Sequence, residues 1–193
     1  MIIDISEYQN PTKIDYKVLC GQLRMAIIRV QYGSKKIDIH YETHIKEMKK
    51  HGVPFGVYAW VRGISETDMA AEAKDFFDRT EDYNPLFYVL DVEEKSMDDM
   101  RAGINAYVKA LRKHTNRKIG AYIAHHRYTE FNIDTGKFDF IWIPHYGRND
   151  GTPSSEPSYP CDLHQYTDRG RLEGYDGYLD LSRLTGTRPL EFD

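Results

Sequence analysis

The chain of 193 residues carries a formal net charge of −4, and 40% of its residues are hydrophobic. A chain of this length can bury the core of one full domain, and the composition is that of a globular protein. The acidic balance provides no basic surface, so we expect no nucleic-acid partner.

The sequence indicates neither a targeting segment nor membrane insertion. Its start, Met1-Ile2-Ile3-Asp4, lacks a basic segment followed by a long apolar one, so we expect no signal peptide. No apolar stretch approaches the roughly 20 residues of a membrane span. Cys20 and Cys161 lie far apart without metal-ligand spacing, and we expect two reduced thiols.

The first third of the chain predicts strands that alternate with helices. Short apolar runs predict buried strands at 1–5, 25–30 and 53–60. A short helix is expected at 14–19. Apolar residues recur at helical spacing from 37 to 48, and Gly52 ends that helix.

The middle of the chain continues the alternation. Ser65 and Asp68 resemble a capping box at the start of a helix. A strand follows at 87–92, and Ser96 is expected to cap the helix that extends to Leu111. A fifth strand at 119–124 and a short helix at 125–131 complete this part.

After residue 137 the pattern changes, because no long amphipathic helix follows. Strands are predicted at 138–143, 163–166 and 178–181, and a polar loop rich in Gly, Pro and Ser occupies 147–160. We expect one domain over 1–185 and a tail or linker over 186–193.

Five strand–helix units followed by three strands lacking long helices predict an α/β fold, an irregular TIM-like barrel. An open doubly wound sheet is the alternative. The barrel is preferred because acids and aromatic residues recur at the predicted carboxyl ends of strands one, four and eight. Active sites of barrels lie on that face.

Four acids stand at these predicted strand ends, namely Asp4, Asp91, Glu93 and Asp180. Alternation along a strand places Asp91 and Glu93 on one face. Paired carboxylates, one protonated and one ionised, are what cleavage of a glycosidic bond requires. A solvated strand end or a metal-binding pair would explain the same two residues.

Several short motifs resemble glycoside hydrolase family 25 lysozymes. The opening Asp4-Ile5-Ser6-Glu7-Tyr8-Gln9 is similar to the start of that family. Seven further motifs follow in the family's order: Ile27-Ile28-Arg29-Val30 with Tyr32-Gly33, Gly56-Val57-Tyr58, Leu90-Asp91-Val92-Glu93, Ala121-Tyr122, Trp142-Ile143 with Tyr146, His164-Gln165-Tyr166-Thr167 and Gly177-Tyr178-Leu179-Asp180-Leu181. The resemblance covers about residues 1–182. Pro144 and His145 depart from the family's pattern.

The resemblance implies a muramidase of bacteria, phages or fungi, with a barrel of five β/α units and three further strands. Such enzymes cleave the β-1,4 bond between N-acetylmuramic acid and N-acetylglucosamine in peptidoglycan. Carried over by motif, Glu93 is the general acid, and Asp91 is the second carboxylate. Asp4 and Asp180 complete the acidic pocket. Asp91 either assists the substrate's acetamido group, which we favour, or activates water.

Aromatic and amide side chains near strand ends are predicted to bind sugars, because flat amphipathic rings suit them. These are Tyr32, Tyr58, Trp60, Tyr122, Trp142, Tyr146 and Gln165. His125, His126 and His145 lack a metal-ligand pattern, so neither a metal nor another cofactor is expected.

The expected partner is the glycan strand of peptidoglycan. A separate wall-binding module could follow the C-terminus, as is common in such enzymes. Without a signal peptide, we expect synthesis in the bacterial host cytoplasm and action on the wall after release. Two alternatives remain: a carbohydrate-binding barrel without activity, and a hydrolase that uses the acids as metal ligands.

Overall fold

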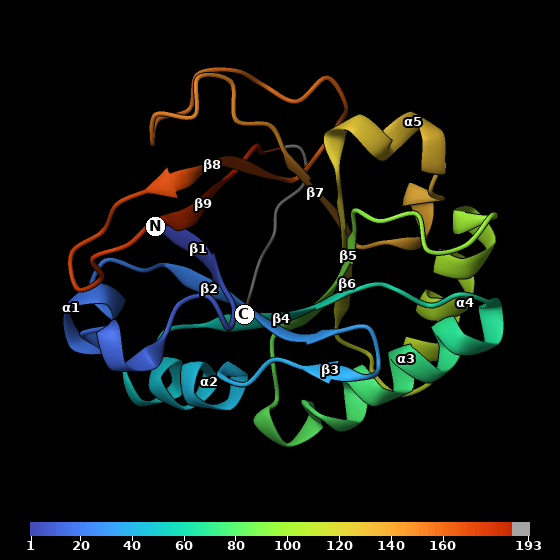
Figure 1. The fold of residues 1–193 in the computed structure, drawn as a ribbon, viewed down its shortest axis with the longest axis horizontal. Coiled ribbons are helices and arrows are strands. Elements are labelled where there is room, and N and C mark those ends of the chain that lie inside the picture. The colour runs from blue at the N-terminus through green and yellow to red at the C-terminus, as the bar shows by residue number, and fades with distance from the viewer. Residues whose placement is uncertain (187–193) are drawn as a thin grey trace.

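The computed structural model describes residues 1–186, in which eight strands close into a barrel surrounded by helices (Figure 1). The strands are β1 (Ile2–Ile5), β2 (Met25–Tyr32), β4 (Phe55–Trp60), β5 (Phe87–Val92), β6 (Lys118–Ile123), β7 (Phe140–Pro144), β8 (Leu163–Gly170) and β9 (Leu179–Leu184). Their order is β1-β9-β8-β7-β6-β5-β4-β2, and pairing of β1 with β2 closes the ring. The short β3 (Lys36–Ile37) pairs with β2 outside the ring.

Helices follow the first five barrel strands, as predicted. The α-helices are α1 (Tyr16–Cys20), α2 (Tyr41–Lys50), α3 (Glu66–Asp78), α4 (Met100–Leu111) and α5 (Tyr128–Phe131). Single 3-10 turns are η1 (Pro11–Lys13), η2 (Glu81–Tyr83), η3 (His125–Arg127) and η4 (Thr135–Lys137). Since β7, β8 and β9 lack long helices, the predicted TIM-like barrel is confirmed. The predicted tail falls largely on 187–193, outside the described residues.

Two details of the prediction are wrong. Ser96 does not cap α4; its hydroxyl donates to the Gly63 carbonyl, 2.7 Å away. The cap is Asp99, whose carboxylate accepts from the Ala102 N–H at 2.9 Å. The last strand also starts later than predicted and runs antiparallel to both its neighbours, β8 and β1.

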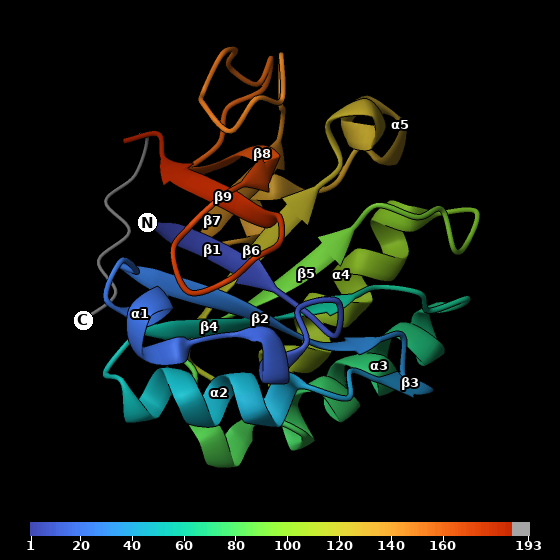
Figure 2. The ribbon, with the colours of Figure 1, turned by 60° about the vertical axis from the view of Figure 1, so that its left-hand side comes forward.

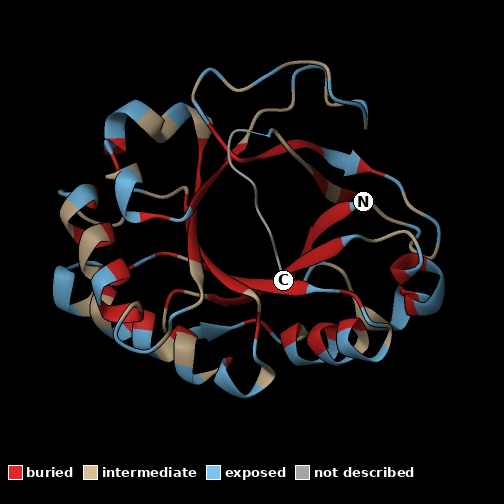
Figure 3. Cartoon of the chain, turned by 180° about the vertical axis from the view of Figure 1, so that it is seen from behind, coloured by how far each residue is buried: buried red, intermediate tan, exposed pale blue. Residues whose placement is uncertain are grey.

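Alternation along the strands produces two separate apolar layers. Odd-numbered residues of β5, such as Phe87 and Val89, point into the barrel, whereas Tyr88 and Leu90 pack against the helices. Figure 3 shows the result, a ring of buried strands inside helices whose outer faces are exposed. The inner apolar layer fills the barrel below its carboxyl end.

Two glycines make room for large rings inside the barrel. A Cβ at Gly56 would overlap the ring of Phe87, and a Cβ at Gly120 would overlap that of Phe140. The two rings pack edge to face, with centroids 5.3 Å apart. They form a floor beneath the polar end of the barrel.

The parallel strands leave the barrel on one side, where α5 and the loop between β7 and β8 also stand (Figure 2). No helix within residues 1–186 is both long and apolar enough to cross a membrane.

Candidate active site

Strand register aligns four large or acidic side chains across the carboxyl end of the barrel. Trp60 of β4 pairs with Asp91 of β5, which pairs with Tyr122 of β6, which pairs with Trp142 of β7. The rings of Tyr122 and Trp142 meet edge to face, with centroids 4.6 Å apart. This row forms one wall of a cavity.

The cavity has a volume of about 270 Å³, and its lining contains all four predicted acids. Asp4 of β1 and Asp180 of β9 are paired residues in the antiparallel register. Because β9 runs antiparallel, the start of this strand lies at the face where the parallel strands end. The acids from three strands therefore converge, as predicted.

Gln165 of β8 ties the two sides of the cavity together. Its amide nitrogen donates to Asp4 Oδ2 at 2.9 Å. Its carbonyl oxygen accepts from the hydroxyls of Tyr122 and Tyr146, at 2.8 and 2.7 Å. These bonds orient one carboxylate and two rings around the same space.

Burial and mutual repulsion favour protonation of the four acids. Burial raises the pKa of Asp4 well above its usual value, and the neighbouring Asp180 raises it further. Burial raises the pKa of Asp180 to about 6. Burial also raises the pKa values of Asp91 and Glu93, which share a hydrogen bond. Such a cluster holds protons near neutral pH, as a general acid requires.

Two buried polar atoms at the cavity have no partner among the described residues, Asp91 Oδ1 and Trp60 Nε1. Buried polar groups are nearly always hydrogen-bonded, so an unsatisfied pair at one wall indicates a place for ligand atoms. Asp91 Oδ1 can accept a hydrogen bond from a ligand N–H or O–H group.

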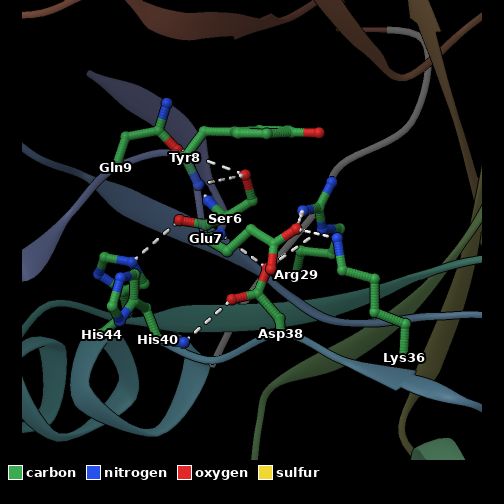
Figure 4. Close-up of polar contacts among 9 residues, drawn as sticks. All are labelled: Ser6, Glu7, Tyr8, Gln9, Arg29, Lys36, Asp38, His40 and His44. Atoms are coloured by element: carbon green, nitrogen blue, oxygen red, sulfur yellow. Dashed lines mark hydrogen bonds and ion pairs between the residues drawn. The ribbon is translucent and has the colours of Figure 1, made fainter.

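Arg29 of β2 is the only cation among the described residues that line the cavity. Its guanidinium pairs with Asp38 at 3.1 Å and with Glu7 at 3.3 Å, and Glu7 also pairs with Lys36 (Figure 4). The ring of Tyr8 covers it at 5.1 Å from centroid to guanidinium carbon. Tyr8 is 73% exposed and therefore presents a supported aromatic face beside the acids.

Most of the residues predicted from sequence line this cavity. Six of the seven predicted sugar-binding residues do so: Tyr58, Trp60, Tyr122, Trp142, Tyr146 and Gln165. Tyr32 is outside the lining and packs against Trp60, with ring centroids 5.0 Å apart. Sequence reasoning missed Ser6, Tyr8, Arg29 and Asp168. Arg29 is the one charged residue in the apolar run 25–30. A charged residue in such a run indicates a side chain that points into a polar site.

The described residues contain no group of three His, Cys, Asp or Glu side chains placed to hold a metal ion. Cys20 and Cys161 are both buried, and no disulfide joins them.

A closed barrel with clustered carboxylates and aromatic rings at the carboxyl ends of its strands has the site of a glycoside hydrolase. A family model for glycosyl hydrolases family 25 matches residues 3–175. The chain belongs to this family.

Several known proteins are similar to this chain. GHIP, described as a glycosyl hydrolase 25 virulence factor of Streptococcus pneumoniae, is 36% identical with a TM-score of 0.91, over 98% of this chain and 87% of that one. The catalytic domain of endolysin ply40 from Listeria monocytogenes bacteriophage P40 is 28% identical with a TM-score of 0.89, over 95% and 92%. The uncharacterized protein YegX of Escherichia coli K12 is 26% identical, over 96% of this chain and 69% of the E. coli protein.

Proposed function

We propose that the protein is a peptidoglycan muramidase, which hydrolyses the β-1,4 bond between N-acetylmuramic acid and N-acetylglucosamine. Four buried acids converge beside aromatic rings, and Asp91 Oδ1 lacks a partner there. This unsatisfied oxygen is the observation that carries the proposal, because an N-acetyl sugar brings the N–H donor that it needs. The similarity to a phage endolysin catalytic domain supports the same substrate.

Glu93 is the proposed general acid. Glu93 and Asp91 are linked by a hydrogen bond, and burial favours their protonated forms. When the acetamido N–H of the substrate donates to Asp91 Oδ1, it stabilises the ionised form of Asp91. The proton then resides on Glu93, which gives it to the oxygen of the leaving sugar.

Asp91 then assists the acetamido group of the substrate. The ionised Asp91 accepts a hydrogen bond from the acetamido N–H, which makes the acetamido oxygen a better nucleophile. This oxygen bonds to the anomeric carbon while the glycosidic bond breaks and Glu93 protonates the leaving oxygen. Water then attacks the anomeric carbon, the bond to the acetamido oxygen breaks, and the Glu93 carboxylate takes the proton from water. Tyr8 and Trp60 offer flat faces against which the sugar rings can pack.

Digestion of purified peptidoglycan, with analysis of the new reducing ends, tests the substrate and the bond. Muramic acid reducing ends are the expected result. Glucosamine reducing ends, or released peptides with intact glycan strands, would contradict the proposal. A metal-dependent hydrolase would lose activity with a chelator, whereas we expect no effect. A binding protein would release no ends.

Glu93→Gln tests the general acid. We expect a loss of about 10²–10⁴-fold in turnover with the fold intact, because the amide cannot protonate the leaving group. Glu94→Gln is the matched control, since Glu94 pairs with Arg62 at 3.0 Å and does not line the cavity. Equal activity of both variants would remove Glu93 from the mechanism.

A further inference from the structure

A second cavity of about 310 Å³ adjoins the candidate active site. The two cavities share the side chains of Glu93, Tyr122 and Tyr146. The remaining lining residues of the second cavity are Ala124, His125, His126, Pro144 and His145. We call it the histidine lobe. A ligand that contacts Glu93 in the first cavity therefore lies beside the second.

The three imidazoles come from two strand ends, and contacts hold two of them, His125 and His145, in place. The rings of His125 and His145 lie 4.5 Å apart between centroids, and His125 lies 5.1 Å from Tyr159. The Ser158 N–H donates to His125 Nε2 at 3.2 Å, so this nitrogen is unprotonated and Nδ1 carries the hydrogen. The third imidazole, His126, is exposed.

Packed side chains next to His125 support the lobe from outside its lining. Tyr159 stacks on Tyr128 of α5 with ring centroids 3.9 Å apart, which joins the loop between β7 and β8 to α5. The backbone of His145 is fixed by β8, since its N–H donates to the Gln165 carbonyl at 2.9 Å. Its carbonyl contacts His164 Nε2 at 2.7 Å.

Among the described side chains that line the lobe, the imidazoles are the ones that can donate a hydrogen bond as cations. Glu93 is the only carboxylate among the described residues that line it. Two sets of charged groups on the surrounding elements pair with one another, Arg127 with Glu130 and Glu156 with Arg183. The acids Asp4, Asp91 and Asp180 of the adjoining cavity act electrostatically on the shared Tyr122 and Tyr146. Tyr122 and Tyr146 are neutral near pH 7, because burial raises both pKa values.

We propose that the histidine lobe binds a carboxylate carried by the sugar that lies against Glu93. The inference rests on the proposed function, because muramic acid bears a lactyl group with a carboxyl end. In intact peptidoglycan this carboxyl is amide-linked to a peptide, which carries carboxylates of its own. Either source supplies an anion that a protonated imidazole binds through a charge-assisted hydrogen bond.

A carboxylate in the lobe is compatible with the chemistry proposed for Glu93. Histidine is the side chain that ordinarily titrates between pH 5 and 8, so pH is the variable that tests whether imidazolium charge contributes to binding. Burial and the neighbouring His145 and His126 lower the pKa of His125, which therefore resists protonation. His126 and His145 are the other two imidazoles of the lobe that can meet the ligand. The protonated Glu93 that catalysis needs does not repel the carboxylate.

Binding measurements in the Glu93→Gln background test the lobe without catalysis. Peptide-free muramyl tetrasaccharide is titrated by calorimetry at pH 5.5 and pH 8, beside the same glycan with its lactyl carboxylates converted to methylamides. We expect the carboxylate form to bind about tenfold more tightly at pH 5.5 and equally at pH 8. Muramyl fragments that carry the peptide are titrated at the same two pH values. Their lactyl carboxyl is amide-linked, so any preference for pH 5.5 then comes from carboxylates of the peptide.

The double variant His126→Gln/His145→Gln should abolish this preference. His51→Gln at the end of α2, outside both cavities, is the matched control and should keep it. His126→Gln alone, at an exposed position, serves if the double variant fails to fold. Persistence of the preference without the histidines, or its absence from the parent, would overturn the proposal.

The binding and digestion experiments test the lobe proposal and the muramidase proposal separately. If wild-type protein releases muramic acid ends but the lactyl carboxylate and the methylamide bind alike, only the lobe is refuted. Binding of neither glycan also overturns the lobe, and the digestion assay then decides separately whether the muramidase proposal survives.

Discussion

Glu72 is a buried acid outside the active site, and its substitution should change how stability depends on pH. The residue is 2% exposed and lies in α3. Both of its carboxylate oxygens accept from the Arg62 N–H, at 3.2 and 3.3 Å. Burial raises its pKa from 4.5 to about 8. At neutral pH the folded protein therefore keeps a proton that the unfolded chain loses.

The sign and size of the effect follow from linkage. Because the pKa is higher in the folded state, the stabilising contribution is complete below pH 4.5 and is lost as the pH rises to 8. A difference of about 3.5 pH units corresponds to a loss of about 5 kcal/mol across this range. Glu72→Gln removes the titration while one oxygen still accepts from Arg62. We expect the variant to exceed wild type in free energy of unfolding at pH 8.

Denaturant unfolding at several pH values between 4.5 and 8 measures the difference between the two proteins. The difference should grow steadily with pH, and Glu66→Gln, at an exposed position of the same helix, should show no such growth. A constant difference across the range would refute the reasoning, because the buried carboxyl would then titrate as it does in the unfolded chain.

Two further substitutions test polar groups that hold the site. Gln165→Leu leaves the Asp4 carboxylate without its amide donor and two tyrosine hydroxyls without an acceptor. We therefore expect the free energy of unfolding, measured with denaturant, to fall by about 2–4 kcal/mol. An unchanged unfolding midpoint would contradict this. His44 contacts the Ser6 carbonyl and the Tyr16 hydroxyl, and burial lowers its pKa from 6.5 to about 4. Wild type should therefore lose up to about 3 kcal/mol as the pH falls from 6.5 to 4, and His44→Gln, but not the control His51→Gln, should flatten this dependence.

The sequence predicted the barrel and its acids because local periodicity contains that information. Asp91 and Glu93 follow Val89 at intervals of two, so their common direction depends only on alternation within one strand. Asp180 was placed at the right face for a wrong reason. The apolar pattern predicts Asp180 at the carboxyl end of the eighth strand, whereas it stands near the start of the antiparallel β9. Both arrangements bring the residue to the same edge of the barrel.

The polar partners of the site could not be predicted, because they depend on contacts between distant segments. Glu7 donates its N–H to Asp38 at 2.7 Å across 31 residues, and Asp38 in turn pairs with Arg29. No sequence period relates these positions. The antiparallel turn into β9 was missed for a similar reason, since strand direction is set by how the chain crosses the barrel.

Arg29 acts on one of the two neighbouring carboxyls, Asp91. Its positive charge lowers the pKa of Asp91 against the larger effects of burial and of Glu93, and so favours the ionised form of Asp91. Asp38 and Glu7 hold the guanidinium at the barrel wall, so this influence is fixed in direction. The acetamido N–H of the proposed substrate would act in the same sense on Asp91 Oδ1. In this structure the hydrogen bond between the two acids raises the pKa of Asp91 and lowers that of Glu93, so it favours the proton on Asp91. Under the proposed mechanism the substrate N–H and Arg29 together reverse this preference and place the proton on Glu93, where the glycosidic oxygen can receive it.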